Sequence, residues 1–150
     1  MANTYTSLYY HLVFATKRRI PMITPDLEVG LYACMRDVLR GRDGRLLKAG
    51  GTADHVHLLV SLSKDVTVTS TLRDIKCNSS GWVHRMFLDR RSFAWQAGYG
   101  AFTVSDLGLG AVRRYIHRQK EHHRKTSLRE ELTGLLAERD IELGGDGIRD

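Results

Sequence analysis

The sequence predicts an α+β fold in which an antiparallel β-sheet carries helices on one face. Segments with the two-residue period of a strand alternate with longer segments that have the 3.6-residue period of an amphipathic helix. In chain order these segments run β-α-β-β-α-β, which is the order of the ferredoxin-like split β-α-β fold. The chain has 150 residues, so we expect one domain over residues 1–150, with its core at about 5–105.

The first strand and the first helix are predicted over residues 5–41. Apolar and polar side chains alternate along 5–16, and a basic turn formed by Lys17-Arg18-Arg19 follows. Thr24-Pro25-Asp26 has the composition of a helix start, because threonine suits the N-cap, proline suits the first helical position and the acid complements the helix dipole. Apolar residues at helical spacing continue this helix until Gly41.

A hairpin, a second helix and a fourth strand complete the predicted sheet. A short strand at 45–50 connects through two glycines to an apolar strand at 55–62, and we expect these two strands to pair. Residues 67–87 have the apolar stripe of a helix, and residues 98–104 return to the sheet as a strand.

Two histidines stand two residues apart in the most apolar strand of the chain. His55 and His57 project to the same face of the sheet, because side chains alternate along a strand. Val56, Leu58 and Val60 line the opposite face, which the two helices are expected to cover. The histidine face is therefore left open unless another element covers it. The two imidazoles are either packed side chains or ligands of one cation, and the strand alone leaves that choice open.

A flexible joint and a strongly basic helix are predicted after the sheet. Two glycines relax the backbone at 106–110. Residues 111–125 then have the pattern of a basic helix. Tyr115 and Gln119 are four residues apart in it and therefore share one helical face.

The C-terminal part of the chain is predicted to be one more helix. Ser127 and Glu130 have the spacing of a capping box. Leucines at helical spacing extend the helix over about 127–140, and we expect 144–150 to be a frayed tail.

The composition indicates a basic protein that has no need of disulfides. The formal net charge is +6, which favours an anionic partner, nucleic acid before membrane. The two cysteines form no CxxC pair, and no apolar run reaches the roughly 18 residues of a membrane span, so we expect a cytoplasmic protein. The side chains that we expect to contact DNA are Lys17, Arg18, Arg19, Arg73, Lys76, Arg113, Arg114, Arg118 and Lys120.

Several of these motifs resemble one enzyme family. His55-Val56-His57 resembles the His-hydrophobe-His motif of the HUH endonucleases. Tyr115-Ile116-His117-Arg118-Gln119 resembles the nucleophile helix of their single-tyrosine transposases, the small enzymes of single-strand insertion sequences. Residues 10–17 and 95–105 also resemble that family, so the similarity covers about residues 5–125 in the family's order.

The resemblance implies a metal-dependent nuclease and strand transferase. It implies that Tyr115 is the nucleophile, that His55, His57 and Gln119 bind the metal, and that the metal is Mg²⁺ or Mn²⁺. The chemistry is consistent, since a phenol is a poor nucleophile and a divalent cation offsets the charge on a phosphodiester oxygen. Attack by the tyrosine would leave a 5′-phosphotyrosine and a free 3′-hydroxyl, so that cleavage can be followed by rejoining.

The resemblance also implies the partners. It implies that the substrate is single-stranded DNA with hairpins at the element ends. It further implies a homodimer in which Tyr115 acts in trans, in the site formed by the other subunit's histidine pair. We expect no membrane and no small-molecule substrate.

Alternative interpretations remain at this point. A non-catalytic nucleic-acid-binding protein with structural histidines has the same predicted fold. A repeat-associated tyrosine transposase is a second alternative, although glutamine at position 119 favours the insertion-sequence branch. His11 is interpreted as structural or DNA-facing. A zinc site at His117, Glu121, His122 and His123 is a weaker candidate, because a basic helix near DNA accounts for the same residues.

Overall fold

A computed structural model describes residues 3–123 and 126–139. Its centre is a four-stranded antiparallel sheet in the order β2-β3-β1-β4, which confirms the predicted α+β, ferredoxin-like topology. The strands are β1 (Tyr9–Ala15), β2 (Arg45–Gly51), β3 (His55–Ser61) and β4 (Gly100–Val104). The helices are α1 (Pro25–Arg40), α2 (Val68–Met86), α3 (Leu109–His117), α4 (Gln119–His122) and α5 (Leu128–Ala137), with short 3₁₀ turns η1 (Lys17–Arg19) and η2 (Asp106–Gly108).

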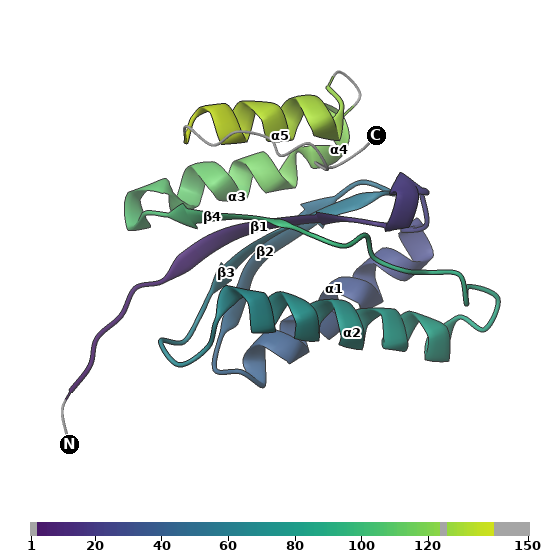
Figure 1. Ribbon diagram of the computed structural model, residues 1–150, viewed down its shortest axis with the longest axis horizontal. Helices are drawn as coiled ribbons and strands as arrows, with labels where there is room; N and C mark the ends of the chain where they lie inside the picture. The colour runs from purple at the N-terminus through teal and green to yellow at the C-terminus, as the bar shows by residue number, and fades with distance from the viewer. Residues whose placement is uncertain (1–2, 124–125, 140–150) are drawn as a thin grey trace.

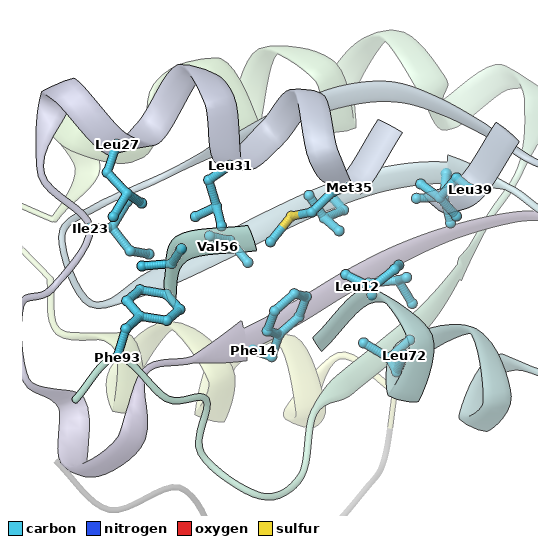
Figure 2. Close-up of a cluster of buried hydrophobic side chains, with 14 of the residues drawn as sticks. Leu12, Phe14, Ile23, Leu27, Leu31, Met35, Leu39, Val56, Leu72 and Phe93 are labelled. Carbon is cyan, nitrogen blue, oxygen red and sulfur yellow. The ribbon is translucent and has the colours of Figure 1, made fainter. Parts of the chain in front are cut away.

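The main hydrophobic core lies between the sheet and helices α1 and α2. Figure 2 shows Leu27, Leu31 and Met35 of α1 directed toward the side chains of the central strands, among them Leu12 and Phe14 of β1. All five side chains are almost completely buried. Burying each stabilises the fold by about 1.5–3 kcal/mol relative to leaving it exposed, so this layer fixes the sheet on which the opposite face depends.

The opposite face of the sheet is covered by the chain's own C-terminal helices. Figure 1 shows α3 and α5 on the side of the sheet away from α1 and α2. A second apolar cluster joins Val13 and Ala15 of β1 and Phe102 of β4 to Leu128 and Leu132 of α5. The histidine face, which the sequence left open, is therefore buried within the single chain.

Two helix starts were predicted from polar N-cap residues, Thr24 and Ser127, and the structure adds Thr67 as a third cap. The Thr67 hydroxyl accepts a hydrogen bond from the Ser70 backbone N–H. The Ser127 hydroxyl accepts one from the Glu130 backbone N–H, which confirms half of the capping box. Thr24 precedes α1 as predicted, but its hydroxyl bonds the Asp26 side chain instead of the backbone.

The predicted basic helix at 111–125 is wrong in its extent. Helix α3 begins earlier, at Leu109, directly after the 3₁₀ turn at 106–108. It ends at His117, because Arg118 has the non-helical angles φ −95° and ψ 14°, and α4 follows as one short turn. The predicted tail at 144–150 lies outside the described residues.

The starts of two strands also differ from the prediction. Strand β1 begins at Tyr9 instead of residue 5, and β4 begins at Gly100 instead of residue 98.

Within residues 3–123 and 126–139, no helix is both long and apolar enough to cross a membrane.

Candidate catalytic and metal centre

The two histidines of β3 form the floor of a buried site. His55 and His57 are 0% exposed, and both face the C-terminal helices, where His57 contacts Glu131 of α5 and His55 contacts Gln119 of α4. Strand β3 lies between β1 and β2, where Val13 and Gly50 are the register partners of His57. Because the strand is hydrogen-bonded on both edges, the two imidazoles are held on a rigid support.

The outer nitrogen of His55 is oriented by a carboxylate. Nδ1 of His55 lies 2.8 Å from Oδ1 of Asp54 and 2.9 Å from Oγ1 of Thr52. Asp54 also pairs with Arg19 at 3.1 Å. Partial burial alone would raise the pKa of Asp54, but the hydrogen bond from His55 and the charge of Arg19 hold it well below its usual range. An ionised carboxylate at Nδ1 favours the tautomer whose Nε2 carries a free lone pair.

A second imidazole orients His57. Nδ1 of His57 lies 2.7 Å from Nε2 of His11, and the two rings stack with centroids 5.0 Å apart. Burial lowers the pKa of His11 to about 3 and that of His57 to about 4, an effect on His57 that Glu131 only partly opposes. Both rings are therefore neutral at pH 7, which is the state in which imidazole binds a metal.

Tyr115 lies above this histidine pair. Its ring centroid is 5.7 Å from that of His57 and 5.9 Å from that of His11. The hydroxyl donates a hydrogen bond to Oε1 of Glu131, a residue of α5. Burial, together with the neighbouring Glu131 carboxylate, raises the pKa of the Tyr115 phenol. The phenol is therefore protonated in this arrangement, with its proton directed at one carboxylate oxygen.

Gln119 joins the same cluster although the helix breaks just before it. The side chain is fully buried. Its Oε1 lies 3.3 Å from Nε2 of His55, and its Nε2 donates to Oε1 of Glu131 at 3.2 Å. The four site residues predicted from the sequence, Tyr115, His55, His57 and Gln119, are thus gathered in one place.

Sequence reasoning missed Glu131. Its carboxylate is the polar centre of the cluster, with Oε1 lying 3.0 Å from Nε2 of His57 and Oε2 pairing with His123. These imidazoles lower the pKa of Glu131 despite the opposing effect of its burial. The sequence does contain an indication of this role. Leu128, Glu131 and Leu132 have the spacing of one helical face. An acid within an apolar stripe is buried with its neighbours, and a buried carboxylate needs a polar or charged partner.

The arrangement contains several cation-binding atoms close together. One nitrogen each from His55, His57 and His123 and one oxygen from Glu131 all lie within 4.8 Å of one another. Among the described residues, Nε2 of His57, Nε2 of His123 and Oε2 of Glu131 are buried without an aligned hydrogen-bond partner. Nε2 of His57 and Oε1 of Glu131, for example, lie 3.0 Å apart without a well-aligned hydrogen bond between them. Donors of this kind fit a divalent cation.

The predicted zinc site at residues 117–123 does not assemble. Nδ1 of His117 lies 3.2 Å from the Lys48 amine, at the edge strand β2. Glu121 is exposed, and of the four proposed ligands only His123 belongs to the group of gathered donors.

The predicted DNA contacts fall into two groups. Arg113, Arg114 and Arg118 are exposed on α3 and at its end, and a hollow beside Tyr115 is lined in part by Arg114, Arg118 and His122. Arg73 and Lys76 lie on α2, on the other face of the sheet, where the Lys76 amine donates to the carbonyl oxygens of Gln96 and Gly98.

The remaining predicted contacts surround a second hollow. Lys17 and Arg18 are exposed in η1. Arg19 and Lys120 line the hollow together with Asp54 and His123. Lys120 pairs with Glu28 of α1 at 2.8 Å, so its charge is partly engaged within the protein.

The fold and the gathered residues define a class of protein. A ferredoxin-like sheet that carries a buried His-X-His pair beneath a tyrosine helix is the arrangement of the HUH single-tyrosine transposases. A sequence model described as "Transposase IS200 like" matches residues 4–119. The chain belongs to this transposase family.

Individual relatives agree with the family. The chain is 28% identical over 126 residues to the transposase for insertion sequence element IS200 of Salmonella typhimurium, covering 81% of this chain and 82% of the relative. It is 25% identical over 122 residues to the ISDra2 transposase TnpA of Deinococcus radiodurans, covering 76% of this chain and 85% of the relative.

Solved structures share the fold. A Deinococcus radiodurans protein assigned as a transposase superposes with a TM-score of 0.64 at 24% identity, covering 79% of this chain and 95% of that one. A REP-associated tyrosine transposase, solved bound to a REP hairpin, superposes with a TM-score of 0.58 at 18% identity, covering 82% of this chain and 74% of that one. At such identities the likeness bears on the fold alone.

Proposed function

We propose that this transposase cleaves and rejoins single-stranded DNA at hairpin-flanked element ends, with Tyr115 as the nucleophile. The observation that carries the proposal is the position of Tyr115. Its hydroxyl lies in the buried cluster with Gln119 and Glu131, while its ring lines a surface hollow with Arg114 and Arg118. A phosphodiester held by these arginines has access to a phenol that is already oriented.

The proposed chemical step is a transesterification. A bond forms between Oη of Tyr115 and phosphorus, and the bond between phosphorus and the 3′-oxygen breaks. The products are a 5′-phosphotyrosine and a 3′-hydroxyl, and the phenol proton balances the proton gained by the leaving oxygen. The reverse step with a new 3′-hydroxyl rejoins the strands without an external energy source. Oε1 of Glu131 fixes the direction in which the phenol proton points.

A divalent cation, Mg²⁺ or Mn²⁺, belongs to the proposal. The atoms that would hold it are Nε2 of His55, Nε2 of His57 and Oε1 of Gln119. The unaligned Nε2 of His57 and the approach of Nε2 of His55 to a carbonyl oxygen support this assignment. When bound there, the cation would offset negative charge on a non-bridging phosphate oxygen.

Hairpin DNA is the proposed ligand, and a homodimer is the proposed assembly. One structural neighbour was solved with a REP hairpin, and the exposed Arg113, Arg114 and Arg118 supply positive charge beside the nucleophile here. In the single chain Tyr115 covers its own His57. We propose that in the dimer the two copies of α3 exchange through the segment at 105–108, so that each tyrosine acts in trans.

The non-catalytic alternative does not account for the site. A protein that only binds nucleic acid has no need for a tyrosine, an amide and two imidazoles that converge in a buried position. Burying polar atoms without aligned partners costs stability. Such a cost is expected at a site whose atoms are arranged for chemistry.

The test is covalent capture of DNA. Full-length protein is incubated with Mn²⁺ and labelled single-stranded DNA that carries the element-end hairpin, and adducts are separated under denaturing conditions. Tyr115→Phe should abolish the adduct and retain hairpin binding in a native gel, because binding rests on charge and shape. Tyr99→Phe is the matched control, since Tyr99 only bonds Thr69 at the surface. An adduct that survives in Tyr115→Phe refutes the assignment of the nucleophile.

A further inference from the structure

The C-terminal helix α5 places a carboxylate at the centre of the histidine cluster. Glu131 is 6% exposed, and its carboxylate contacts His57, His123, Tyr115 and Gln119. His123 follows the tyrosine helix, and its Nε2 is buried. Neither residue belongs to the His-His-Gln set assigned above: Glu131 has been given only the contact with the Tyr115 hydroxyl, and His123 has no role in the proposed chemistry.

The spacing of the donor atoms matches a coordination sphere. Two ligands that bind one cation at about 2.1 Å and at right angles lie about 3.0 Å apart. Oε1 of Glu131 and Nε2 of His57 are 3.0 Å apart, and the four donors from His55, His57, His123 and Glu131 all lie within 4.8 Å of one another. Two ligands on opposite sides of one cation lie about 4.2 Å apart, so a small inward movement of the outermost donors lets a single ion reach all four.

The hydrogen-bond network leaves the same atoms with free lone pairs. Nδ1 of His55 is turned to Asp54, and Nδ1 of His57 is turned to Nε2 of His11. When the outer nitrogen of a ring donates in such a contact, its inner nitrogen carries the free lone pair that a metal binds. Nε2 of His57 has no aligned hydrogen bond although an oxygen is near it.

We propose that His123 and Glu131 are ligands of the metal, in addition to the pair on β3. Together with His55, His57 and Gln119 they make a site of three imidazoles, one carboxylate and one amide oxygen. Imidazole-rich sites bind Mn²⁺, Co²⁺ and Zn²⁺ in preference to Mg²⁺, which prefers oxygen donors. This inference rests on the proposed function, because it extends the cation site assigned there. It adds that the donors come from three distant parts of the chain, and that α5 is fastened to the sheet by the cation.

The test measures metal affinity, independent of activity. Full-length protein is freed of metal with a chelator that is then removed, and Mn²⁺, Zn²⁺ and Mg²⁺ are each titrated by competition with a chromophoric chelator. Glu131→Gln keeps the shape of the side chain, and His123→Gln removes one imidazole. Each is expected to weaken Mn²⁺ and Zn²⁺ binding by at least about tenfold. Glu130→Gln, an exposed acid on the same helix, is expected to bind like the wild type.

A spectroscopic measurement on the wild-type protein tests the proposal even where a variant folds poorly. Magnetic resonance of bound Mn²⁺ counts coordinated nitrogens, and it is applied to the wild-type protein alone. Three imidazoles support the proposal, and two imidazoles overturn the role of His123. Unchanged affinity in Glu131→Gln, with binding lost in His57→Ala, overturns the role of Glu131 and leaves the proposed function intact. Unchanged affinity in His57→Ala refutes the metal site of the proposed function itself.

Discussion

Asp54 links the histidine strand to the first turn of the chain. It accepts from His55 on one side and pairs with Arg19 of η1 on the other. A carboxylate behind a metal-binding imidazole fixes the tautomer and makes the ligand more basic. In the proposed metal site, Asp54 is thus a positioning residue that acts on the cation through His55.

Removing the charge of Asp54 should weaken metal binding. In Asp54→Asn the amide oxygen still accepts the Nδ1 proton, but the negative charge is gone. We expect Mn²⁺ affinity to fall about 10- to 100-fold, measured by chelator competition on the full chain. Asp65→Asn is the control, because Asp65 bonds only its neighbours Lys64 and Ser63. Equal affinity in the two variants would show that Asp54 has no influence on the site.

The site residues differ in how far the sequence predicts them. His55 and His57 are two apart in one strand, and Tyr115 and Gln119 are four apart on one helix, so local geometry alone pairs them. Their convergence across 60 residues was an expectation of the resemblance, and the structure brings them together. Glu131 has no such local partner. Its role depends on how α5 packs, which no spacing in the sequence specifies.

At the scale of elements, the tyrosine helix rests directly on a glycine of the sheet. A Cβ atom at Gly50 of β2 would lie 2.5 Å from the backbone oxygen of Ile116 and 2.9 Å from its Cγ2. Ile116 is the neighbour of Tyr115 and is buried against the sheet. The height of Tyr115 above the histidines therefore depends on the absence of a side chain at this position.

Gly50→Ala should displace α3 from the sheet. We expect a loss of about 1–3 kcal/mol in the free energy of unfolding, which is typical of overpacking, and a slower formation of the tyrosine–DNA adduct. Urea unfolding and the denaturing-gel assay measure the two effects. Gly134→Ala on α5 has open space for its methyl group and should be neutral or stabilising. Wild-type stability and adduct rate in Gly50→Ala would contradict the close packing.

The first turn of α1 gives the fold a pH dependence. Asp26 accepts from Thr24 and pairs with Arg90 at 3.0 Å, and these two contacts lower the pKa of its carboxyl group. Because the folded state favours the ionised form, the stabilisation is complete above the unfolded pKa of about 3.9. It is lost as the pH falls through the lower folded value.

Asp26→Asn isolates this contribution. The wild type should be more stable than Asp26→Asn at pH 6–7, and the difference should shrink as the pH falls below about 4. Urea midpoints of both proteins across this range provide the measurement. Asp65→Asn again serves as the control, with a difference expected to stay small throughout. A wild-type advantage that grows toward low pH would reverse the inferred sign.

The order and type of the main elements could be predicted, but several ends could not. Strand β1 begins at Tyr9 because its register partners, Ser61 and Val104, are the last residues of β3 and β4. Before Tyr9, the carbonyl oxygen of Leu8 accepts a hydrogen bond from the Leu62 N–H, but Leu8 lies beyond the ends of both partner strands.

The helix break at Arg118 could not be predicted, because no glycine or proline stands next to it in the sequence. It coincides with tertiary contacts of the next turn, in which Gln119 enters the cluster.

At the scale of the whole molecule, the sheet separates two layers: the main hydrophobic core lies on one face, and the candidate site lies on the other. Helices α1 and α2 seal one face, and α3 and α5 close the other over the site (Figure 1). The chain passes from the sheet into the second layer through the turn at 105–108. Exchange of α3 between two copies would therefore leave the main core untouched.

Complementation tests that exchange. Tyr115→Phe and His57→Ala subunits are each expected to be inactive alone. If the tyrosine acts in trans, a mixed dimer has one site with both defects and one intact site, and cleavage of a hairpin end should return on mixing. Separately tagged subunits confirm that heterodimers form. Heterodimers that stay inactive would reject exchange and favour assembly within each chain, without bearing on the nucleophile.

The order of the donors along the chain has a consequence for synthesis. His55 and His57 are made well before Glu131, and at ribosomal rates the interval is on the order of 4–15 s. If the proposed site holds a cation, a growing chain would offer an unfinished set of ligands during that time, from which ions exchange readily. Helix α5 would then close over whichever ion is present. The metal content of the finished protein would thus record the ions available while it was being translated, as well as the preference of the completed site.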